Sequence, residues 1–258
     1  MPTVTRESSW DARIARAREL ASTCPAARDL LTFYAALAEY QGALAGSAGD
    51  AGEFDAGRVI AAIPGFLAWL RQNGRGDVVE SVDVDFVGSW IRQESGDSHS
   101  LPAARSADNP ATSFVIESLL QAFAEQLVNG DVPRTLGSTP MRCPRCAALP
   151  VAAVLREEGH GAKRFLLCGL CLQEWECLRM VCPACGEQDF DKLPVYTAEQ
   201  FAHVRIDACD SCHHYVKTID LTKDGLAVPC VDDLASVSLD LWARERGYTR
   251  IRPNVLGI

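Results

Sequence analysis

The sequence predicts an α+β multidomain protein, in which an all-α N-terminal bundle precedes two tandem metal-centred modules with small antiparallel sheets and a C-terminal helix. Apolar residues recur at helical spacing through roughly the first 130 residues. Four Cys-x-x-Cys pairs follow between residues 143 and 212, and an amphipathic segment comes after them. The predicted boundaries are 1–132 for the helical domain, 133–140 for a linker, 141–180 and 181–223 for the two modules, and 224–258 for the C-terminal helix and tail.

Turn signals and apolar stripes divide the helical domain. The strongest helix start is Asn109-Pro110, because asparagine caps a helix and proline fits its first position. A loop is expected over 42–57, which is rich in Gly, Ala and Asp, and Pro64 should lie in the first turns of its helix or mark a kink. Further helices are predicted from Trp10, from Pro25, over Arg58–Asn73 and over Val84–Arg92.

The paired cysteines carry the clearest chemical signal. Two residues between two thiols allow both sulfur atoms to face one point, and two such knuckles can supply a tetrahedral shell of four cysteines for zinc or a single iron ion. The predicted ligand sets are Cys143, Cys146, Cys168 and Cys171 for the first module, and Cys182, Cys185, Cys209 and Cys212 for the second.

Other uses of the cysteines fit the sequence less well. A disulfide framework requires an oxidising compartment, but the start MPTVTRESSW lacks the basic and apolar regions of an export signal, so we expect a cytoplasmic protein. A redox-active Cys-x-x-Cys motif normally occurs once, whereas this chain has four. We expect no membrane insertion, because no segment reaches about 18 apolar residues.

Short strands are predicted between and after the knuckles. The first module should have strands at Leu149–Leu155, Arg164–Leu167 and within Leu172–Val181. The second should have strands at Leu193–Thr197, Phe201–Ile206 and Tyr215–Ile219. This plan is typical of a zinc-ribbon or rubredoxin-like module. A module of about forty residues seldom folds without an additional cross-link, which a structural metal ion can provide.

Several residues near the knuckles have specific expectations. Gly186 should adopt a positive φ that directs backbone N–H groups at sulfur, and Ala147 at the equivalent position should cost about 1 kcal/mol if the same backbone is needed. His213 and His214 follow a complete set of four cysteines and are not expected to be ligands. The unpaired Cys24, Cys177 and Cys230 are best interpreted as small apolar residues.

The final helix is predicted over Asp232–Arg246, with Asp232 or Asp233 as its cap and Gly247 as its end. The formal charge of −9 argues against general attraction to a phosphate backbone, so we expect no nucleic acid among the partners. No Ser/His/Asp set, phosphate-binding glycine loop or paired-carboxylate motif stands out, which favours a non-enzymatic role. The sequence leaves the oligomeric state open.

The cysteine region resembles the formate dehydrogenase accessory proteins of the FdhE family. The resemblance rests on CPRC…CGLCLQEWECLRMVCPACG, on CDSCHHYVK and on DDLASVSLDLWARERGY, and covers roughly residues 140–250. Glu174-Trp175 and Arg179 are part of the pattern, whereas Ala147 departs from it because the family often has glycine there. The N-terminal part of the chain agrees with the family only in being helical.

The resemblance implies a non-catalytic, cytoplasmic maturation factor that binds the catalytic subunit of respiratory formate dehydrogenase. It also implies that the eight paired cysteines hold two metal ions, each iron or zinc. Two alternatives remain at this stage. One is a rubredoxin-like iron protein that passes single electrons or senses oxygen, and the other is a nucleic-acid-binding zinc ribbon protein.

Overall fold

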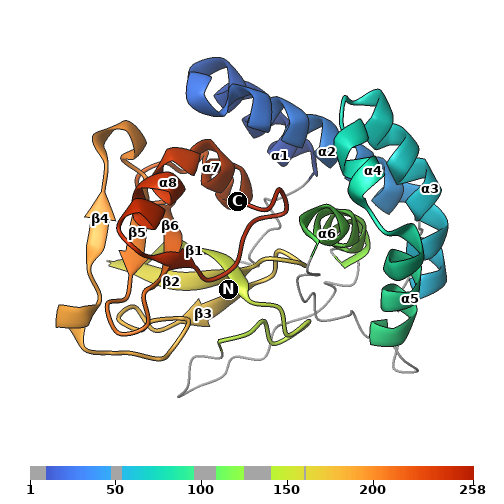
Figure 1. Cartoon of the computed structure of the whole chain (residues 1–258). Helices are drawn as coiled ribbons and strands as arrows, with labels where there is room; N and C mark the ends of the chain where they lie inside the picture. Colours follow the sequence, from blue (N-terminus) through green and yellow to red (C-terminus); the bar gives the residue numbers. More distant parts are fainter. Residues whose placement is uncertain (1–9, 48–53, 96–108, 125–140, 160) are drawn as a thin grey trace.

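The computed structural model describes residues 10–47, 54–95, 109–124, 141–159 and 161–258. Its N-terminal part is helical, as predicted (Figure 1). The helices are α1 (Trp10–Thr23), α2 (Arg28–Ser47), α3 (Ala56–Gln72), α4 (Gly76–Ser81), α5 (Val84–Ser95) and α6 (Pro110–Ala124), and a short 3₁₀ helix at Pro25–Ala27 precedes α2. The predicted linker at 133–140 lies outside the described residues.

Local sequence explains most of these helix boundaries. The Asn109 carboxamide oxygen accepts the backbone N–H groups of Ala111 and Thr112, which confirms the predicted cap of α6. Two details were predicted wrongly: helix α2 continues to Ser47 into the expected loop, and α4 was not predicted. Pro64 lies in the interior of α3 and not in its first turns, which leaves the kink as the remaining part of that prediction.

The helices bury one apolar face against each other. Phe66 and Trp69 stack with ring centroids 5.7 Å apart, and Tyr40 and Phe33 pack against the same aromatic group. The core formed in this way continues into the cysteine region, because buried residues of both parts belong to one contact cluster.

Seven strands of the described residues form one sheet in the order β3-β2-β1-β6-β5-β4, with β7 paired to β6. The strands are β1 (Pro150–Glu158), β2 (Gly161–Cys168), β3 (Glu174–Cys177), β4 (Val195–Thr197), β5 (Val204–Ala208), β6 (His214–Asp220) and β7 (Thr249–Arg250). Pairing is antiparallel within each module, as expected. A parallel pair, β1 with β6, joins the two modules into a continuous mixed sheet, which the sequence did not predict.

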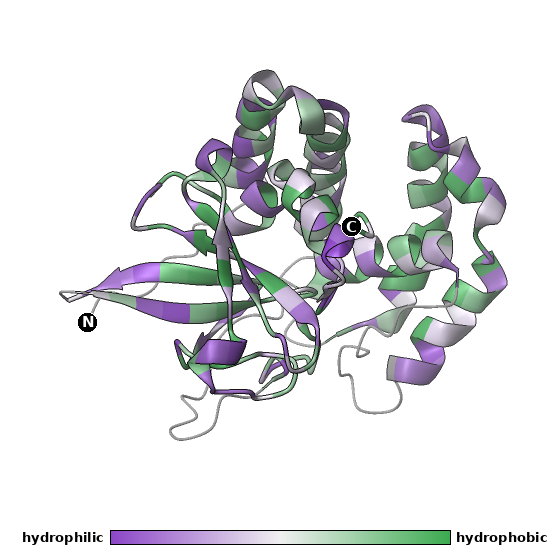
Figure 2. Cartoon of the chain, turned by 60° about the vertical axis from the view of Figure 1, so that its left-hand side comes forward, coloured by the Kyte–Doolittle hydropathy of each residue, from purple (hydrophilic) through white to green (hydrophobic). Residues whose placement is uncertain are grey.

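The β1–β2 hairpin extends beyond the rest of the sheet. Its residues are buried where the strands enter the sheet and exposed towards the tip, and the projecting end is mainly hydrophilic in Figure 2. On β5 and β6 the alternation places Val204, Ile206 and Tyr215 on the face covered by the C-terminal helices. Arg205 and Thr218, which are paired across β5 and β6, lie on the opposite face.

The predicted helix at Asp232–Arg246 is two helices, α7 (Pro229–Ala235) and α8 (Val237–Glu245). The break falls at buried Ser236, whose hydroxyl donates to the main-chain oxygen atoms of Asp232 and Asp233. Such local side-chain bonds compete with helix continuation. Asp232 and Asp233 lie inside α7 and do not occupy the cap position.

Helix α7 lies between the sheet and the N-terminal helices and contacts both α1 and α2 (Figure 1). Arg16 of α1 reaches Asp232 of α7, with N–O distances of 2.7 and 3.1 Å. On another side, Arg252 of the C-terminal segment pairs with Glu117 of α6 at 3.1 Å. In the described part of the chain no helix has the length and apolar character needed to cross a membrane.

Candidate metal centres

The first centre brings together one knuckle before β1 and one after β2. Its Sγ–Sγ distances are 3.7 Å for Cys143–Cys171, 3.3 Å for Cys146–Cys168 and 3.6 Å for Cys146–Cys171. All four residues are buried, with exposed fractions from 0 to 5%. The sheet positions this centre, because the β1–β2 pairing fixes Pro150 opposite Cys168 and so brings the two knuckles together.

The second centre combines the knuckle that follows β3 with the one between β5 and β6. Its Sγ–Sγ distances are 3.7 Å for Cys182–Cys212 and 3.7 Å for Cys185–Cys209. Cys182 and Cys209 are buried, whereas Cys212 is partly exposed and Cys185 is exposed. This centre therefore opens towards solvent on the side of Cys185.

Both groups fit a four-coordinate metal ion. In each group the four sulfur atoms lie within 4.8 Å of one another. Tetrahedral coordination at a Zn–S distance of about 2.3 Å places sulfur atoms about 3.8 Å apart, close to the spacings found here. No disulfide is formed among the eleven cysteines, all of which are described. Each group could thus hold one metal ion, and four thiolates suit either zinc or iron.

The backbone of the knuckles repeats around both centres. A residue with positive φ follows the second cysteine of every pair: Ala147 (57°), Leu172 (52°), Gly186 (80°) and His213 (55°). The prediction for Gly186 is confirmed, and Ala147 adopts the same left-handed conformation despite its Cβ atom. No local pattern indicated that Leu172 and His213 would adopt this conformation as well.

This turn directs polar backbone groups at the sulfur atoms. The N–H groups of Leu170 and Cys171 lie 3.4 Å from the Sγ atom of Cys168, and that of Ala184 lies 3.4 Å from the Sγ atom of Cys182. Such N–H groups stabilise thiolate charge and therefore favour metal binding.

The thiols of the first centre influence one another's ionisation. Hydrogen bonds with Cys146, Cys168 and Cys171 lower the pKa of Cys143, whereas hydrogen bonds with Cys143, Cys146 and Cys168 raise the pKa of Cys171. Four thiols this close therefore do not all ionise by themselves. A bound cation supplies the positive charge that a set of four thiolates requires.

In the second centre the thiol pKa differs between a buried and an exposed cysteine. Burial raises the pKa of the Cys182 thiol to about 11. Burial also opposes ionisation of Cys185, but hydrogen bonds from the main chain of Glu187 and from neighbouring thiols outweigh it and lower the Cys185 pKa. The exposed Cys185 thus becomes a thiolate more readily than the buried Cys182.

The remaining cysteines and the two histidines lie outside both groups. The Cys177 thiol donates to the main-chain oxygen of Leu178 at 3.3 Å, and the Cys230 sulfur lies 3.6 Å from the Tyr34 hydroxyl. The ring of His214 bonds through Nδ1 with the main-chain oxygen of Cys212 at 2.8 Å. Among the described residues, the groups that could hold an ion include neither His213 nor His214.

Sequence reasoning missed a third cluster, formed by His203, Asp224 and Asp232. The Arg16 guanidinium lies 2.8 Å from Asp224 and 2.7 Å from Asp232, so its positive charge already compensates one of the two negative charges. Burial alone would raise the pKa of Asp232, but hydrogen bonds from His203 and Arg16 outweigh it and lower this pKa. The cluster joins α1 to α7.

A buried ionic network lies under α7 and α8 and was also missed. Lys217 is fully buried, and its Nζ atom is 2.6 Å from Asp240 and 3.2 Å from Asp233. Arg250 contacts the same two carboxylates. The only sequence signal was the acidic pattern in DDLASVSLD, a segment that is otherwise largely apolar. The basic partners, Lys217 and Arg250, come from other segments, so the sequence of this stretch alone does not reveal the network.

Family models match the whole cysteine region. Residues 142–179 match "FdhE, central domain" and residues 180–256 match "FdhE, C-terminal domain". The crystal structure of the FdhE protein from Pseudomonas aeruginosa superposes with a TM-score of 0.73 and 26% sequence identity, over 97% of each chain. The cysteine region, residues 142–256, thus matches FdhE family models, and the whole chain is similar in fold to the FdhE protein of Pseudomonas aeruginosa.

Curated relatives agree with this assignment. The FdhE homolog of Aquifex aeolicus is 41% identical over 116 residues, which cover 45% of this chain and 41% of that protein. The FdhE homolog of Haemophilus influenzae strain Rd is 38% identical over 109 residues, which cover 42% of this chain and 35% of that protein. The aligned part of the chain thus spans about two fifths of the length of these relatives. The comparisons favour neither the electron-transfer nor the nucleic-acid alternative.

Proposed function

We propose that this chain is a non-catalytic accessory factor for the maturation of respiratory formate dehydrogenase, and that it binds the catalytic subunit of that enzyme in the cytoplasm. The match of residues 142–256 to FdhE family models, together with the similar fold of the FdhE protein of Pseudomonas aeruginosa, is the observation that carries this proposal. The eight paired cysteines act as ligands of two structural metal ions, and the metal-stabilised sheet presents the surface that binds the partner.

The chemistry of the two centres supports a structural role for the metals. A set of four cysteines leaves no open coordination position for a substrate. A structural zinc ion can contribute about 10–16 kcal/mol to folding at pH 7, which matches or exceeds the stability of a typical domain. The ions, when bound, hold the knuckles together, and the chain's own strands and loops form the binding surface.

A pull-down of the catalytic subunit with the full, metal-loaded chain tests this proposal. Wild-type protein should retain the subunit, and Cys212→Ser should weaken retention because the second centre loses a ligand. Cys24→Ser is the matched control, because Cys24 lies outside both centres. Undiminished retention by Cys212→Ser, together with normal formate oxidation in cells carrying it, would contradict the proposal.

A further inference from the structure

Exposed apolar side chains gather near the second centre. Four of the eight large hydrophobic residues that are exposed in the described part of the chain lie within the short stretch from 178 to 195. They are Leu178, Met180, Phe190 and Val195, with exposed fractions of 55, 49, 69 and 50%. Concentrated apolar exposure of this kind on a soluble surface is typical of a binding site for another molecule.

Two of these residues, Met180 and Val195, line a small groove that has a volume of about 40 Å³. Small-molecule and cofactor pockets usually measure roughly 300–1,000 Å³, so this groove is too small for such ligands. About 10–15 Å³ of this kind of volume holds one water molecule. The groove therefore has room for the tip of a side chain, such as a carboxylate group.

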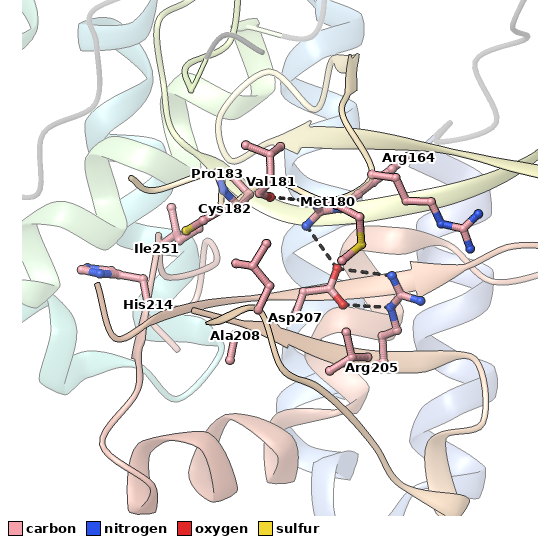
Figure 3. A pocket seen from close by; sticks show the side chains of 13 residues that line it. Arg164, Met180, Val181, Cys182, Pro183, Arg205, Asp207, Ala208, His214 and Ile251 are labelled. Atoms are coloured by element: carbon pink, nitrogen blue, oxygen red, sulfur yellow. Dashed lines mark hydrogen bonds and ion pairs between the residues drawn. The ribbon is translucent and has the colours of Figure 1, made fainter. Parts of the chain in front are cut away.

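The polar lining of the groove is basic. The carboxylate of Asp207 lies 3.1 Å from a terminal nitrogen of Arg164 and 2.8 Å from Nε of Arg205, and it also accepts the Thr218 hydroxyl. Figure 3 shows Arg164 and Arg205 both joined to Asp207, with Met180 beside this trio. Asp207 thus holds two guanidinium groups together but compensates only one of their two positive charges.

A third arginine adds to this excess. Arg179 lines the same groove, is exposed and has no carboxylate partner among the described residues. The Nε–H group of Arg164 is buried without an acceptor within the described structure. Three of the lining residues are arginines and one is an aspartate, whereas the whole chain has a formal charge of −9. The arginine side of the groove can therefore pair with a carboxylate from a partner.

The edge of the sheet lies at the same place. Strand β4, which begins at Val195, is the last strand in the sheet order and pairs with β5 on one side only. An edge strand can receive an extended polypeptide through main-chain hydrogen bonds. The opposite wall of the groove includes Cys182 and Pro183 of a metal-binding knuckle, so the second centre fixes the shape of this wall.

From these observations we propose that the groove beside the second centre binds an extended, apolar segment of a partner polypeptide and takes up an acidic side chain from it. The carboxylate pairs with Arg179 and Arg205, while neighbouring apolar side chains contact Met180 and Val195. The identity of the partner as formate dehydrogenase rests on the proposed function, but the binding chemistry does not depend on it.

Fluorescence anisotropy of synthetic peptides on the full, metal-loaded chain tests the groove directly. The first probe is a fluorescein-labelled peptide in which Leu and Glu alternate, and the second has Lys in place of Glu. The acidic probe should bind, should bind more weakly at higher salt, and should lose at least about tenfold in affinity with Arg179→Glu. The basic probe should not bind.

Matched surface variants control for charge and hydrophobicity. Arg244→Glu reverses an exposed arginine on α8, which covers the opposite face of the sheet, and should leave binding of the acidic probe unchanged. Met180→Ser should weaken binding, whereas Leu241→Ser should not, although Met180 and Leu241 are similarly exposed at 49 and 53%. Metal content of two ions per chain confirms that each variant is folded.

The outcomes separate this inference from the proposed function. If the acidic probe does not bind, if Arg179→Glu binds it like wild type, or if labelled oligouridine binds at Arg179 in its place, the groove assignment is wrong. The same variants are then compared in a pull-down of the catalytic subunit of formate dehydrogenase. Equal retention by all variants, together with peptide binding that does not depend on Arg179, leaves the proposed function intact and overturns the groove. Arg179-dependent peptide binding without retention of the subunit supports the groove and contradicts the proposed function.

Discussion

The two metal centres have nearly the same ligand spacing but very different surroundings. The first lies in the core cluster that also contains the N-terminal helices, and none of its cysteines is more than 5% exposed. The second lies at the end of the sheet, where Cys185 is exposed and Cys212 is partly exposed. Ligand spacing thus determines that a centre can form, whereas the packing of distant segments determines how strongly the rest of the fold depends on it.

The largest expected difference concerns removal of one ligand. Cys168→Ser should unfold the sheet and undock the helices. The loss of a buried structural metal site costs on the order of 10 kcal/mol, which is as large as the free energy of unfolding of a typical domain. Cys212→Ser should unfold only the region around residues 182–214. Amide hydrogen exchange measured by mass spectrometry distinguishes the two results. Equal loss of protection in both variants would mean that the centres are equivalent.

The second prediction concerns the ion pair that joins α1 to α7. Arg16→Leu should cost about 3 kcal/mol at neutral pH, because it leaves the buried Asp232 carboxylate without its guanidinium partner. The native pKa of Asp232 is lowered, so its ion pair is complete above the unfolded-state pKa of about 3.9 and is lost as the pH falls through the native pKa. The stability difference from wild type should therefore shrink below about pH 4.

Urea unfolding of both proteins between pH 7 and pH 2.5 measures this difference. Metal release in acid affects both proteins alike, so it cancels in the comparison. A difference that stays constant or widens on acidification would show that the Asp232 carboxylate does not hold α1 and α7 together.

The third prediction concerns Gly169, inside a knuckle of the first centre. A Cβ atom at this position would lie 2.3 Å from the Arg252 side chain, so Gly169→Ala should destabilise the fold by about 2 kcal/mol. The equivalent position of the second centre is occupied by Asp210, which is exposed. Combining Gly169→Ala with Arg252→Ala should cost less than the two separate changes added together.

Thermal unfolding of the four proteins in this double-mutant cycle gives the coupling energy. Gly161→Ala is the control, because no atom lies within 4 Å of the added methyl group. Strict additivity would show that Arg252 does not restrict the knuckle.

The fourth prediction concerns metal release. A strong chelator should remove the ion from the second centre at least about tenfold faster than from the first, which corresponds to a barrier difference of about 1.4 kcal/mol. The reason is that solvent and chelator can reach Cys185 without opening the core. A colorimetric assay should show two phases of one ion each, and a single phase would contradict the difference in accessibility.

The smallest effects are expected at the left-handed residues that follow the knuckles. Ala147→Gly should stabilise the first centre by about 1 kcal/mol, because glycine adopts the φ of 57° without a steric penalty. Gly186→Ala, at a φ of 80°, should destabilise the second by about the same amount. The midpoints of urea unfolding measure both changes, and shifts of the same sign would contradict this account.

Much of the candidate site could be predicted from sequence because its determinants are local. A Cys-x-x-Cys pair brings its own two sulfur atoms together, and the runs at Leu149–Leu155 and Tyr215–Ile219 have the composition of strands wherever they pair. The capping of α6 by Asn109 is likewise decided within three residues.

The features that could not be predicted depend on distant partners. The parallel pairing of β1 with β6 depends on segments about 65 residues apart, and no local signal encodes it. The prediction that Asp232 or Asp233 caps the final helix is wrong, because both lie inside α7 and pair with Arg16 and Arg250 from other parts of the chain. The unequal exposure of the two centres has the same origin.

The pairing of Arg16 with Asp232 joins residues that are 216 positions apart, and β1 gains its partner β6 only after the second module. During synthesis, therefore, Arg16 gains no carboxylate from α7 until residue 232 has left the ribosome, although Glu19 of its own helix can pair with it before then. A nascent chain that ends before residue 214 also lacks β6, so this edge of β1 stays open. The order of the segments thus delays the docking of α1 until α7 has been made.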